Sequence, residues 1–429
     1  MTTMLWRSLV LSATLLLAGG CVNGRGARSA WLADSDAQQS RREMMRAMFV
    51  GSGLANTVVG FVTRDGVQEF VPMGTRSVGG AAKVDADTLY DIASMTKAIT
   101  ATAALQLVEQ GKLSLDEPVE GILPELRQIQ ILQADGSRRA PSRPLTLRDL
   151  LRHTSGFAYF FNTPVIAAEL ELDPVTGFPK PEVLEEGVYD WGFDVQPRRI
   201  FDAGERWCYG RGVGVAGRVV ERVSGLDLDT YFKRHIFAPL GMTRSGYNVS
   251  AELMRERAVM HARDAVSGEL AALPDVRPAP MERFYGGGGL LSTPRDYARF
   301  LRCLLNGGEL DGVRILGEEM VALMTADQLP DGVRVNMAAM PGVDTSDRRS
   351  FVSEFDDGYS LAWAIEVGGE DGSRPEGVGY WSGIFNTYYT VDPARGVAIM
   401  SFTQLMPFDD AAAYELYRTY EDAVYSALR

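Results

Sequence analysis

The sequence has few residues that could bind a transition metal. It contains only three cysteines and three histidines in 429 residues, and no two cysteines have the C-x-x-C spacing of zinc or redox sites. The histidines also lack the spacing of metal ligands; they are His153, His235 and His261. We therefore expect no metal and no cofactor. For Cys208 and Cys303 two alternatives stay open, a disulfide in an oxidising compartment or two buried thiols.

Positive charge is also scarce. Lys and Arg number 43 against 56 for Asp and Glu, which gives a formal net charge of −13. Nucleic acid binding needs a basic field over the phosphates, and the most basic stretch, GSRRAPSRP (136–144), is a loop that contains Pro and Gly. The composition therefore excludes nucleic acid as a partner. A hydrophobic content of 46% instead predicts a globular protein with a sizeable core.

Apolar runs long enough to span a membrane are absent from the sequence. The run SLVLSATLLLA (8–18) follows Arg7 and is shorter than the ~20 residues that a spanning helix needs. It ends in small residues before Cys21, and this pattern resembles a bacterial lipoprotein signal, in which the cysteine is lipidated. We expect a signal peptide at 1–20, a tether at 21–35, and an exported envelope protein anchored to the membrane at Cys21. The alternative is ordinary signal cleavage, which would leave a periplasmic or secreted protein.

Strand patterns lie at both ends of the remaining chain, with helical patterns between them. Residues 35–51 predict a capped amphipathic helix, and residues 56–74 predict a hairpin that turns at Asp65-Gly66. Towards the C-terminus we expect four strands, at 359–367, 377–383, 386–392 and 396–403, and then a last helix at 409–428. The predicted fold class is α+β: an antiparallel sheet built from both chain ends, flanked by helices, with an inserted, mainly helical lobe. One domain, 36–429, would then comprise a sheet lobe (36–112 and 346–429) and a helical lobe (113–345).

The stretch DIASMTKAIT (91–100) carries a chemical pattern. Ser94 and Lys97 lie three residues apart at the start of a predicted helix that ends at Gly111, and a helix places such residues on one face. A lysine whose pKa is lowered by burial can accept the serine proton, while the helix N-terminus aims N–H groups at an oxyanion. The alternative is a helix-capping serine with a surface lysine, because S-x-x-K recurs by chance. A catalytic role is favoured over capping, because this S-x-x-K is the only one in the chain and apolar residues flank it.

The surrounding residues resemble the serine β-lactamase and penicillin-binding-protein superfamily, and within it the family VIII carboxylesterases. The resemblance runs in order over roughly 40–405, which is more specific than one motif. Its stretches are LYDIASMTKAITATAALQLVEQGKLSLDEPV (89–119), LTLRDLLRHTSGF (145–157), IFAPLGMTRSGY (236–247), GGGGLLSTPRDYARFLRCLLNGGELDGVRIL (286–316) and WSGIFNTYYTVDP (381–393). It implies a β-lactamase/transpeptidase-like fold and an acyl-enzyme on Ser94.

A second motif follows from the resemblance alone. The stretch FDAGERWCYGRGVGVAGRVVERVSG (201–225) is similar to the family's tyrosine motif and implies that Tyr209 shares proton transfer with Lys97. Arg211 departs from this pattern, because β-lactamases of this kind usually carry asparagine there. The departure weakens the lactamase interpretation more than the esterase one.

The third motif looks like Trp381-Ser382-Gly383, where the lactamases have Lys-Thr-Gly. Gly383 suits a strand whose backbone approaches a ligand closely, and the next N–H, from Ile384, would join that of Ser94 as the oxyanion hole. A lysine in place of Trp381 would hold a substrate carboxylate. We therefore expect a neutral ester or amide as substrate; the alternative is that Trp381 is a core residue.

Several other patterns have simpler explanations. GVGVAG (212–217) fits G-x-G-x-x-G but leads into a second helix, so its glycines are expected to allow close helix packing. GGGG (286–289) lacks the Lys-Ser/Thr of a phosphate loop and predicts a flexible turn near the site. His153 is expected to be a structural hydrogen-bonding residue. FAYFFN (157–162) and YDWGF (189–193) either line a substrate cleft or pack the lobe. No G-x-S-x-G occurs, which excludes an α/β-hydrolase elbow.

These patterns predict a serine hydrolase that cleaves carboxylic esters through an acyl-enzyme on Ser94, with Lys97 and Tyr209 as general base and acid. Which of the two accepts the serine proton stays open. The first alternative is a β-lactamase or DD-peptidase-like penicillin-binding enzyme on the same scaffold. An alternative of another class is an inactive binding protein of the envelope. The expected partner is a small-molecule ester or amide.

Overall fold

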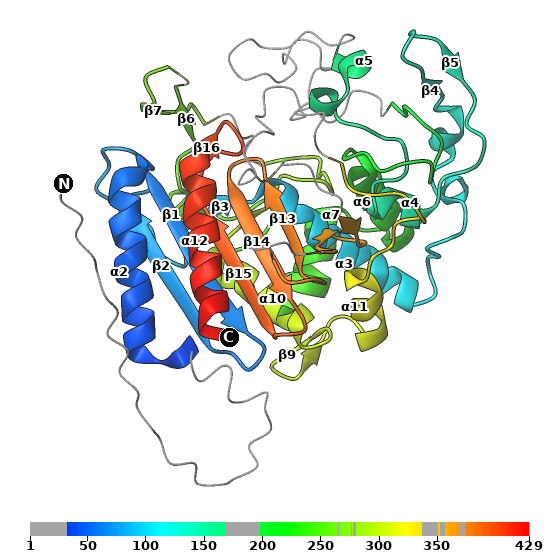
Figure 1. Ribbon diagram of the computed structural model, residues 1–429. Coiled ribbons are helices and arrows are strands. Elements are labelled where there is room, and N and C mark those ends of the chain that lie inside the picture. The colour runs from blue at the N-terminus through cyan, green and yellow to red at the C-terminus, as the bar shows by residue number, and fades with distance from the viewer. Residues whose placement is uncertain are drawn as a thin grey trace, which may run out of the picture.

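The computed structural model describes residues 32–167, 198–264, 266–275, 277, 280–336, 351, 357–368 and 374–428. The expected signal peptide, Cys21 and the aromatic stretch 189–193 lie outside the described residues. A large antiparallel sheet is flanked by helices, and the strands from the two chain ends are separated in sequence by a mainly helical lobe (Figure 1). The predicted α+β class is therefore confirmed.

Seven strands from both chain ends form the central sheet. They are β1 (Asn56–Thr63), β2 (Gln68–Gly74), β11 (Gly358–Tyr359), β12 (Ala364–Ile365), β13 (Gly379–Gly383), β14 (Thr387–Asp392) and β15 (Val397–Phe402). Their order is β11-β12-β13-β14-β15-β1-β2, and all neighbours are antiparallel. The predicted hairpin is β1 and β2, with Gly66 at φ 95° in its turn. Val58 of β1 faces Phe402 of β15, and this pairing joins the two ends of the chain.

One predicted strand is wrong. The sequence pattern at 359–367 predicted a single strand, whereas the structure has β11 and β12 as two short antiparallel strands. A tight turn separates them, because the Ser360 hydroxyl accepts hydrogen bonds from the N–H groups of Ala362 and Trp363, both at 3.1 Å. Serine hydroxyls favour such local bonds over a strand ladder.

Helices cover both faces of the sheet. On one face lie α2 (Ser35–Ser52) and α12 (Ala411–Leu428), and on the other α10 (Pro294–Leu305), as Figure 1 shows. The Asp34 side chain caps α2, which ends one residue later than predicted, before Gly53 at φ 65°. Because both faces are covered, β1 and β15 are buried along their whole length, which explains their apolar runs.

The helix that carries the S-x-x-K motif is α3 (Thr96–Glu109), and it lies between the sheet lobe and the helical lobe. All its residues from Thr96 to Leu107 are buried, as expected for a helix that is apolar on every side. It packs against α6 (Gly212–Ser224). Lys97 of the motif therefore lies in the interior of the molecule, whereas Ser94, directly before α3, is half-buried.

The remaining elements are short. The helices are η1 (Ala93–Met95), η2 (Val119–Gly121), η3 (Pro124–Gln128), α4 (Leu147–Leu151), η4 (Phe160–Asn162), α5 (Pro164–Ala167), α7 (Leu228–Phe232), η6 (Lys233–Phe237), α8 (Ala238–Leu240), α9 (Ala251–Met254) and α11 (Glu318–Thr325). The strands are β3 (Tyr90–Asp91), β4 (Ile131–Leu132), β5 (Arg138–Arg139), β6 (His261–Arg263), β7 (Leu270–Ala272), β8 (Leu291–Ser292), β9 (Glu309–Leu310), β10 (Val313–Arg314) and β16 (Leu405–Met406). None of the helices in the described ranges combines the length and the apolar character that crossing a membrane requires.

Candidate active site

Ser94 lies in the short helix η1, directly before α3. The preceding residue, Ala93, has φ 45°, a left-handed conformation that is costly for a residue with a Cβ. Such strain persists only where the surrounding structure holds it, and it turns the chain sharply between β3 and the helix. The first N–H groups of a helix have no partner within it. The Ser94 N–H is one of these groups and is therefore available to a developing negative charge.

Lys97 lies on the same face as Ser94, as the helical spacing predicted. Its Nζ is 2.9 Å from Ser94 Oγ and donates a hydrogen bond to the Gly287 carbonyl at 2.7 Å. The side chain is only 1% exposed, and burial lowers the pKa of Lys97 well below its ordinary value of 10.5. Within the described ranges no carboxylate pairs with this amine. Burial therefore favours the neutral form of the Lys97 amine, whose lone pair would lie near the serine hydroxyl.

Tyr209 completes the hydrogen-bonding group around the serine. It lies in an irregular stretch before α6, and its hydroxyl donates a hydrogen bond to Ser94 Oγ at 2.8 Å. Its ring also covers the Lys97 amine, with Nζ 4.8 Å from the ring centroid. Burial raises the pKa of Tyr209, although its hydrogen bonds with Ser94 and Trp381 oppose this shift. The phenol therefore keeps its proton at neutral pH.

The end of β13 lies against the segment that leads into Ser94. A Cβ on Gly383 would come within 2.5 Å of the Ile92 carbonyl oxygen and 2.4 Å of Thr387 Oγ1. Only glycine allows this approach, as the sequence pattern suggested. Ile384 is the first residue after β13 and is half-buried. Ile384 therefore follows a strand end that lies close to η1.

Trp381 packs behind Tyr209. It is 2% exposed, and its ring lies 5.0 Å from the Tyr209 ring and 5.3 Å from the Tyr359 ring. Because the indole has a single N–H, the side-chain hydrogen bond that it makes to Tyr209 uses its one donor. This position therefore offers no cation to a substrate carboxylate.

Sequence reasoning missed two participants, Tyr285 and Gly287. The Tyr285 hydroxyl lies 3.3 Å from that of Tyr159, whose ring is 5.2 Å from Tyr209, so three tyrosines gather beside Lys97. The glycine run at 286–289 was expected only as a turn near the site, yet its Gly287 carbonyl accepts the Lys97 hydrogen bond. The available signal was an aromatic residue directly before a glycine run, in which a Cβ on Gly287 would lie 2.5 Å from the Tyr285 ring.

The glycines of GVGVAG serve packing, as predicted. A Cβ on Gly214 would lie 2.0 Å from the Tyr285 ring, and one on Gly217 would lie 3.0 Å from Gly286. These glycines form the first turns of α6 and bring the helix close to the 285–287 segment. Arg211, the residue that departs from the family pattern, is 7% exposed. Burial raises the pKa of Tyr159 well above its ordinary value, and the charge of Arg211 only partly opposes this shift.

The histidines and cysteines lie on separate elements. His153 follows α4, its Nδ1 accepts the Gly210 N–H at 3.3 Å, and the predicted structural role is confirmed. His235 lies in η6 and His261 in β6. In the part of the chain that the structure describes, no group of His, Cys, Asp and Glu side chains could hold a metal ion. Cys208 and Cys303 are free thiols, which decides between the two alternatives left open above.

Comparison with known proteins agrees with this geometry. Residues 45–422 match the family described as Beta-lactamase. The chain is 32% identical over 398 residues to an uncharacterised protein of Mycobacterium tuberculosis, covering 88% of this chain and 92% of that protein. It is 31% identical over 353 residues to the monacolin J acid methylbutanoyltransferase of Aspergillus terreus, with 79% and 82% of the two chains covered. It is also 31% identical over 351 residues to the lovastatin esterase of Penicillium rubens, with 79% and 85% covered.

A solved structure agrees with the fold over nearly the whole chain. A variant of the simvastatin synthase of Aspergillus terreus superposes with a TM-score of 0.78 and 27% sequence identity. The superposition covers 97% of this chain and 99% of that one.

Proposed function

Because the chain belongs to the beta-lactamase family, whose relatives here include serine hydrolases and acyltransferases, we propose that it hydrolyses carboxylic esters through an acyl-enzyme on Ser94. The observation that carries the proposal is that one hydroxyl, Ser94 Oγ, lies within hydrogen-bonding distance of both a potential proton acceptor and a proton donor. Lys97 Nζ lies 2.9 Å and Tyr209 Oη 2.8 Å from Ser94 Oγ. One partner is an amine whose pKa is lowered by burial, and the other is a phenol whose pKa is raised by burial.

The pKa directions assign the roles in acylation. Ser94 Oγ attacks the ester carbonyl carbon and passes its proton to the Lys97 lone pair, because a phenol that has kept its proton cannot accept another. The N–H groups of Ser94 and Ile384 bind the oxyanion. As the C–O bond breaks, the leaving alkoxide takes the Tyr209 proton, and the proton held on Lys97 restores the phenol. The products are the free alcohol and an acylated Ser94.

Deacylation repeats these steps with water in place of serine. Lys97 accepts a water proton while the oxygen attacks the acyl carbon, and Ser94 Oγ leaves with the proton that Tyr209 supplies. The carboxylic acid is released, and every group returns to its starting protonation state. Each donor of the oxyanion hole contributes about 3–4 kcal/mol to such a barrier.

A fluorophosphonate probe tests the nucleophile. We expect one covalent adduct, on the peptide that carries Ser94, and none after heat unfolding, because only the folded site activates the hydroxyl. The Ser94→Ala protein should remain unlabelled while it keeps its fold by circular dichroism. Labelling of that variant would refute the assignment, and a folded wild-type protein that takes no label would favour an inactive binding protein.

The substrate class is tested with two chromogenic compounds, p-nitrophenyl butyrate and nitrocefin. We expect turnover of the ester to be faster, because position 381 carries tryptophan where a lysine would bind the carboxylate of a β-lactam. Fast nitrocefin turnover with negligible ester cleavage would identify a β-lactamase instead. Slow reaction with both would point to a bulkier acyl group.

Acyl transfer is a second candidate function, favoured by the similarity to the methylbutanoyltransferase and the simvastatin synthase. The chemistry to the acyl-enzyme is the same, and an alcohol replaces water as the second nucleophile. The experiment measures how the acyl group divides between acid and new ester when an alcohol is added. Formation of ester in excess of acid at millimolar alcohol would identify a transferase.

We also propose that the protein is exported and anchored by a lipid on Cys21. The support is the apolar run at 8–18, the preceding Arg7 and the small residues before the cysteine. Mass spectrometry of the mature N-terminus should find a lipidated cysteine, and Cys21→Ala should release the protein from the membrane fraction. An unmodified N-terminus downstream of Cys21 would indicate ordinary signal cleavage.

A further inference from the structure

Tyr209 has no helix or strand to hold it in place. The residues from Arg206 to Gly210 form an irregular stretch that ends just before α6. The Tyr209 hydroxyl nevertheless lies at hydrogen-bonding distance from Ser94 Oγ, 2.8 Å. Proton transfer is sensitive to this geometry, and a displacement of 1 Å can cost about 10²-fold in rate. Contacts from elsewhere in the fold must therefore hold the backbone around Tyr209.

His153 contacts the residues on both sides of Tyr209. Its carbonyl accepts the Cys208 N–H at 3.0 Å, and its ring nitrogen Nδ1 accepts the Gly210 N–H at 3.3 Å. The imidazole also packs edge-on against the tyrosine ring, with the centroids 4.9 Å apart. His153 thus contacts three consecutive residues, Cys208, Tyr209 and Gly210.

The backbone conformation of His153 makes this double contact feasible. Its φ is 60°, in the left-handed region that few residues other than glycine adopt, although histidine and asparagine are enriched there. This conformation lets the carbonyl and the side chain of one residue face the same neighbouring segment. Strain of this kind is retained where the surrounding contacts compensate for it.

The ring of His153 must be neutral to make its contact. Because the Gly210 N–H donates to Nδ1, that nitrogen carries a lone pair and the ring proton lies on Nε2. Burial lowers the pKa of His153 well below 6.5, and the charge of a protonated Lys97 lowers it further. The side chain is 1% exposed, and the rings of Tyr209, Tyr359 and Trp207 surround it. The lone pair on Nδ1 is therefore present whenever Lys97 and Tyr209 are in their working states.

We propose that His153 is a positioning residue for the reaction, which acts through Tyr209 and not on the substrate. Its Nδ1 lone pair holds the Gly210 N–H, and this bond keeps the Tyr209 hydroxyl on Ser94 Oγ. The inference rests on the proposed function, since it requires that Tyr209 transfers a proton. It names a residue that the S-x-x-K and tyrosine motifs do not include.

Two substitutions at position 153 separate the hydrogen bond from the volume of the ring. His153→Asn keeps an acceptor near the position of Nδ1 and tolerates a positive φ, whereas His153→Leu has a similar volume and no acceptor. We expect kcat for p-nitrophenyl butyrate to fall about 10²-fold in the leucine variant and to recover most of this loss in the asparagine variant. KM should change little in either, because His153 does not touch the substrate. If the leucine variant does not fold, His153→Gly replaces it, since glycine suits φ 60°.

Combining these variants with Tyr209→Phe tests whether His153 acts through the phenol. In the Tyr209→Phe background the hydroxyl is already missing, so His153→Leu should lower kcat by no more than about 3-fold. A residue that merely stabilised the fold would lower kcat by the same factor in both backgrounds. Equal factors, or an asparagine variant as slow as the leucine variant, would overturn the proposal. If Tyr209→Phe alone has wild-type kcat, the proposed proton transfer fails, and this result is distinct from a failure of His153.

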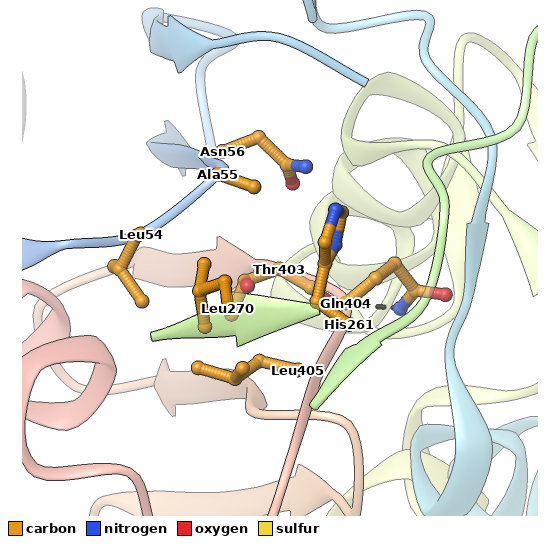
Figure 2. A pocket seen from close by; sticks show the side chains of 8 residues that line it. All are labelled: Leu54, Ala55, Asn56, His261, Leu270, Thr403, Gln404 and Leu405. Atoms are coloured by element: carbon orange, nitrogen blue, oxygen red, sulfur yellow. Dashed lines mark hydrogen bonds between the residues drawn. The ribbon is translucent and has the colours of Figure 1, made fainter. Parts of the chain in front are cut away.

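His261 provides a matched control. It is also 1% exposed, and its Nε2 accepts the Val78 N–H at 3.0 Å. It lines a small pocket, shown in Figure 2, to which none of the active-site residues contributes (its lining residues are Leu54, Ala55, Asn56, His261, Leu270, Thr403, Gln404 and Leu405). His261→Leu should lower the melting temperature about as much as His153→Leu and leave kcat of the folded protein unchanged. A comparable fall in kcat would mean that loss of any buried imidazole slows the enzyme, and would overturn the proposal.

Discussion

Two buried basic side chains in this protein have opposite surroundings. Lys97 and Arg374 are 1% and 6% exposed, respectively. Arg374 pairs with Glu421 of α12 at 2.8 Å, and Glu421 is also bonded to Arg418. Burial works against the charge of Arg374, but Glu421 and the neighbouring tyrosines raise its pKa above the ordinary value. Among the described residues, Lys97 makes hydrogen bonds with a hydroxyl and a carbonyl and lies against aromatic rings, and burial lowers its pKa.

The comparison separates structure from chemistry. A buried base that has a carboxylate keeps its proton and connects parts of the fold, here the segment before β13 and the helix α12. A buried lysine that lacks a carboxylate has a lowered pKa, which favours the neutral amine that can accept a proton from a neighbouring hydroxyl. Residue type and partner, more than burial itself, therefore decide whether a buried basic side chain is structural or reactive, because a guanidinium keeps its proton whatever its surroundings.

The largest expected effect is the loss of activity on replacing Lys97, the buried base that lacks a carboxylate. Lys97→Met should lower kcat/KM by about 10³–10⁴-fold, because the serine loses the group that accepts its proton. Lys97→Arg should be equally slow, since a guanidinium does not give up its proton. Hydrolysis of p-nitrophenyl butyrate measures both. Lys233→Met, at a half-exposed lysine paired with Asp229, is the control and should keep wild-type activity.

A result at Lys97 could break the comparison. If Lys97→Arg retained activity within about 10-fold of the wild type, a neutral amine would not be required for the reaction. The lysine would then act as a cation, like Arg374, and Tyr209 would have to be the base.

The second expected effect is a loss of stability on breaking the buried ion pair between Arg374 and Glu421. Glu421→Gln should lower the free energy of unfolding by about 3–5 kcal/mol, because it leaves Arg374 charged and buried without its carboxylate. Urea unfolding measures this loss. The control is Asp311→Asn in the exposed pair with Arg299, whose side chains are 51% and 37% exposed and which should cost less than about 1 kcal/mol. Equal costs at the two sites would show that the buried pair is no more important than the exposed one.

The smallest effect is a pH dependence of stability. Burial lowers the pKa of Lys97 in the folded protein well below 10.5, its ordinary value in the unfolded chain. Stability from this site therefore rises with pH up to 10.5, by about 1.4 kcal/mol per pH unit, and is then complete. The difference in unfolding free energy between wild type and Lys97→Met should follow this slope between about pH 8 and 10. A difference independent of pH would mean that Lys97 is charged in the folded protein.

Local patterns predicted the parts of the fold that local chemistry controls. The hairpin at Asp65-Gly66 and the shared face of Ser94 and Lys97 follow from turn preferences and helical spacing, and both are present. The strand expected at 359–367 failed because one serine hydroxyl closes a turn inside an apolar run. Hydrophobic periodicity gives no information about this competition between side-chain hydrogen bonds and the strand ladder.

The sequence by itself determined the fold class, the S-x-x-K pair and, through the family resemblance, Tyr209. Only the tertiary structure decided the protonation states, because these depend on burial and on distant neighbours. Tyr209 lies 115 positions from Ser94, and the carbonyl of Gly287 lies 190 positions from Lys97. The same reason applies to His153, which holds a segment 57 positions away through a bond to Gly210. Spacing along the chain carries no information about such contacts, since folding alone brings these residues together.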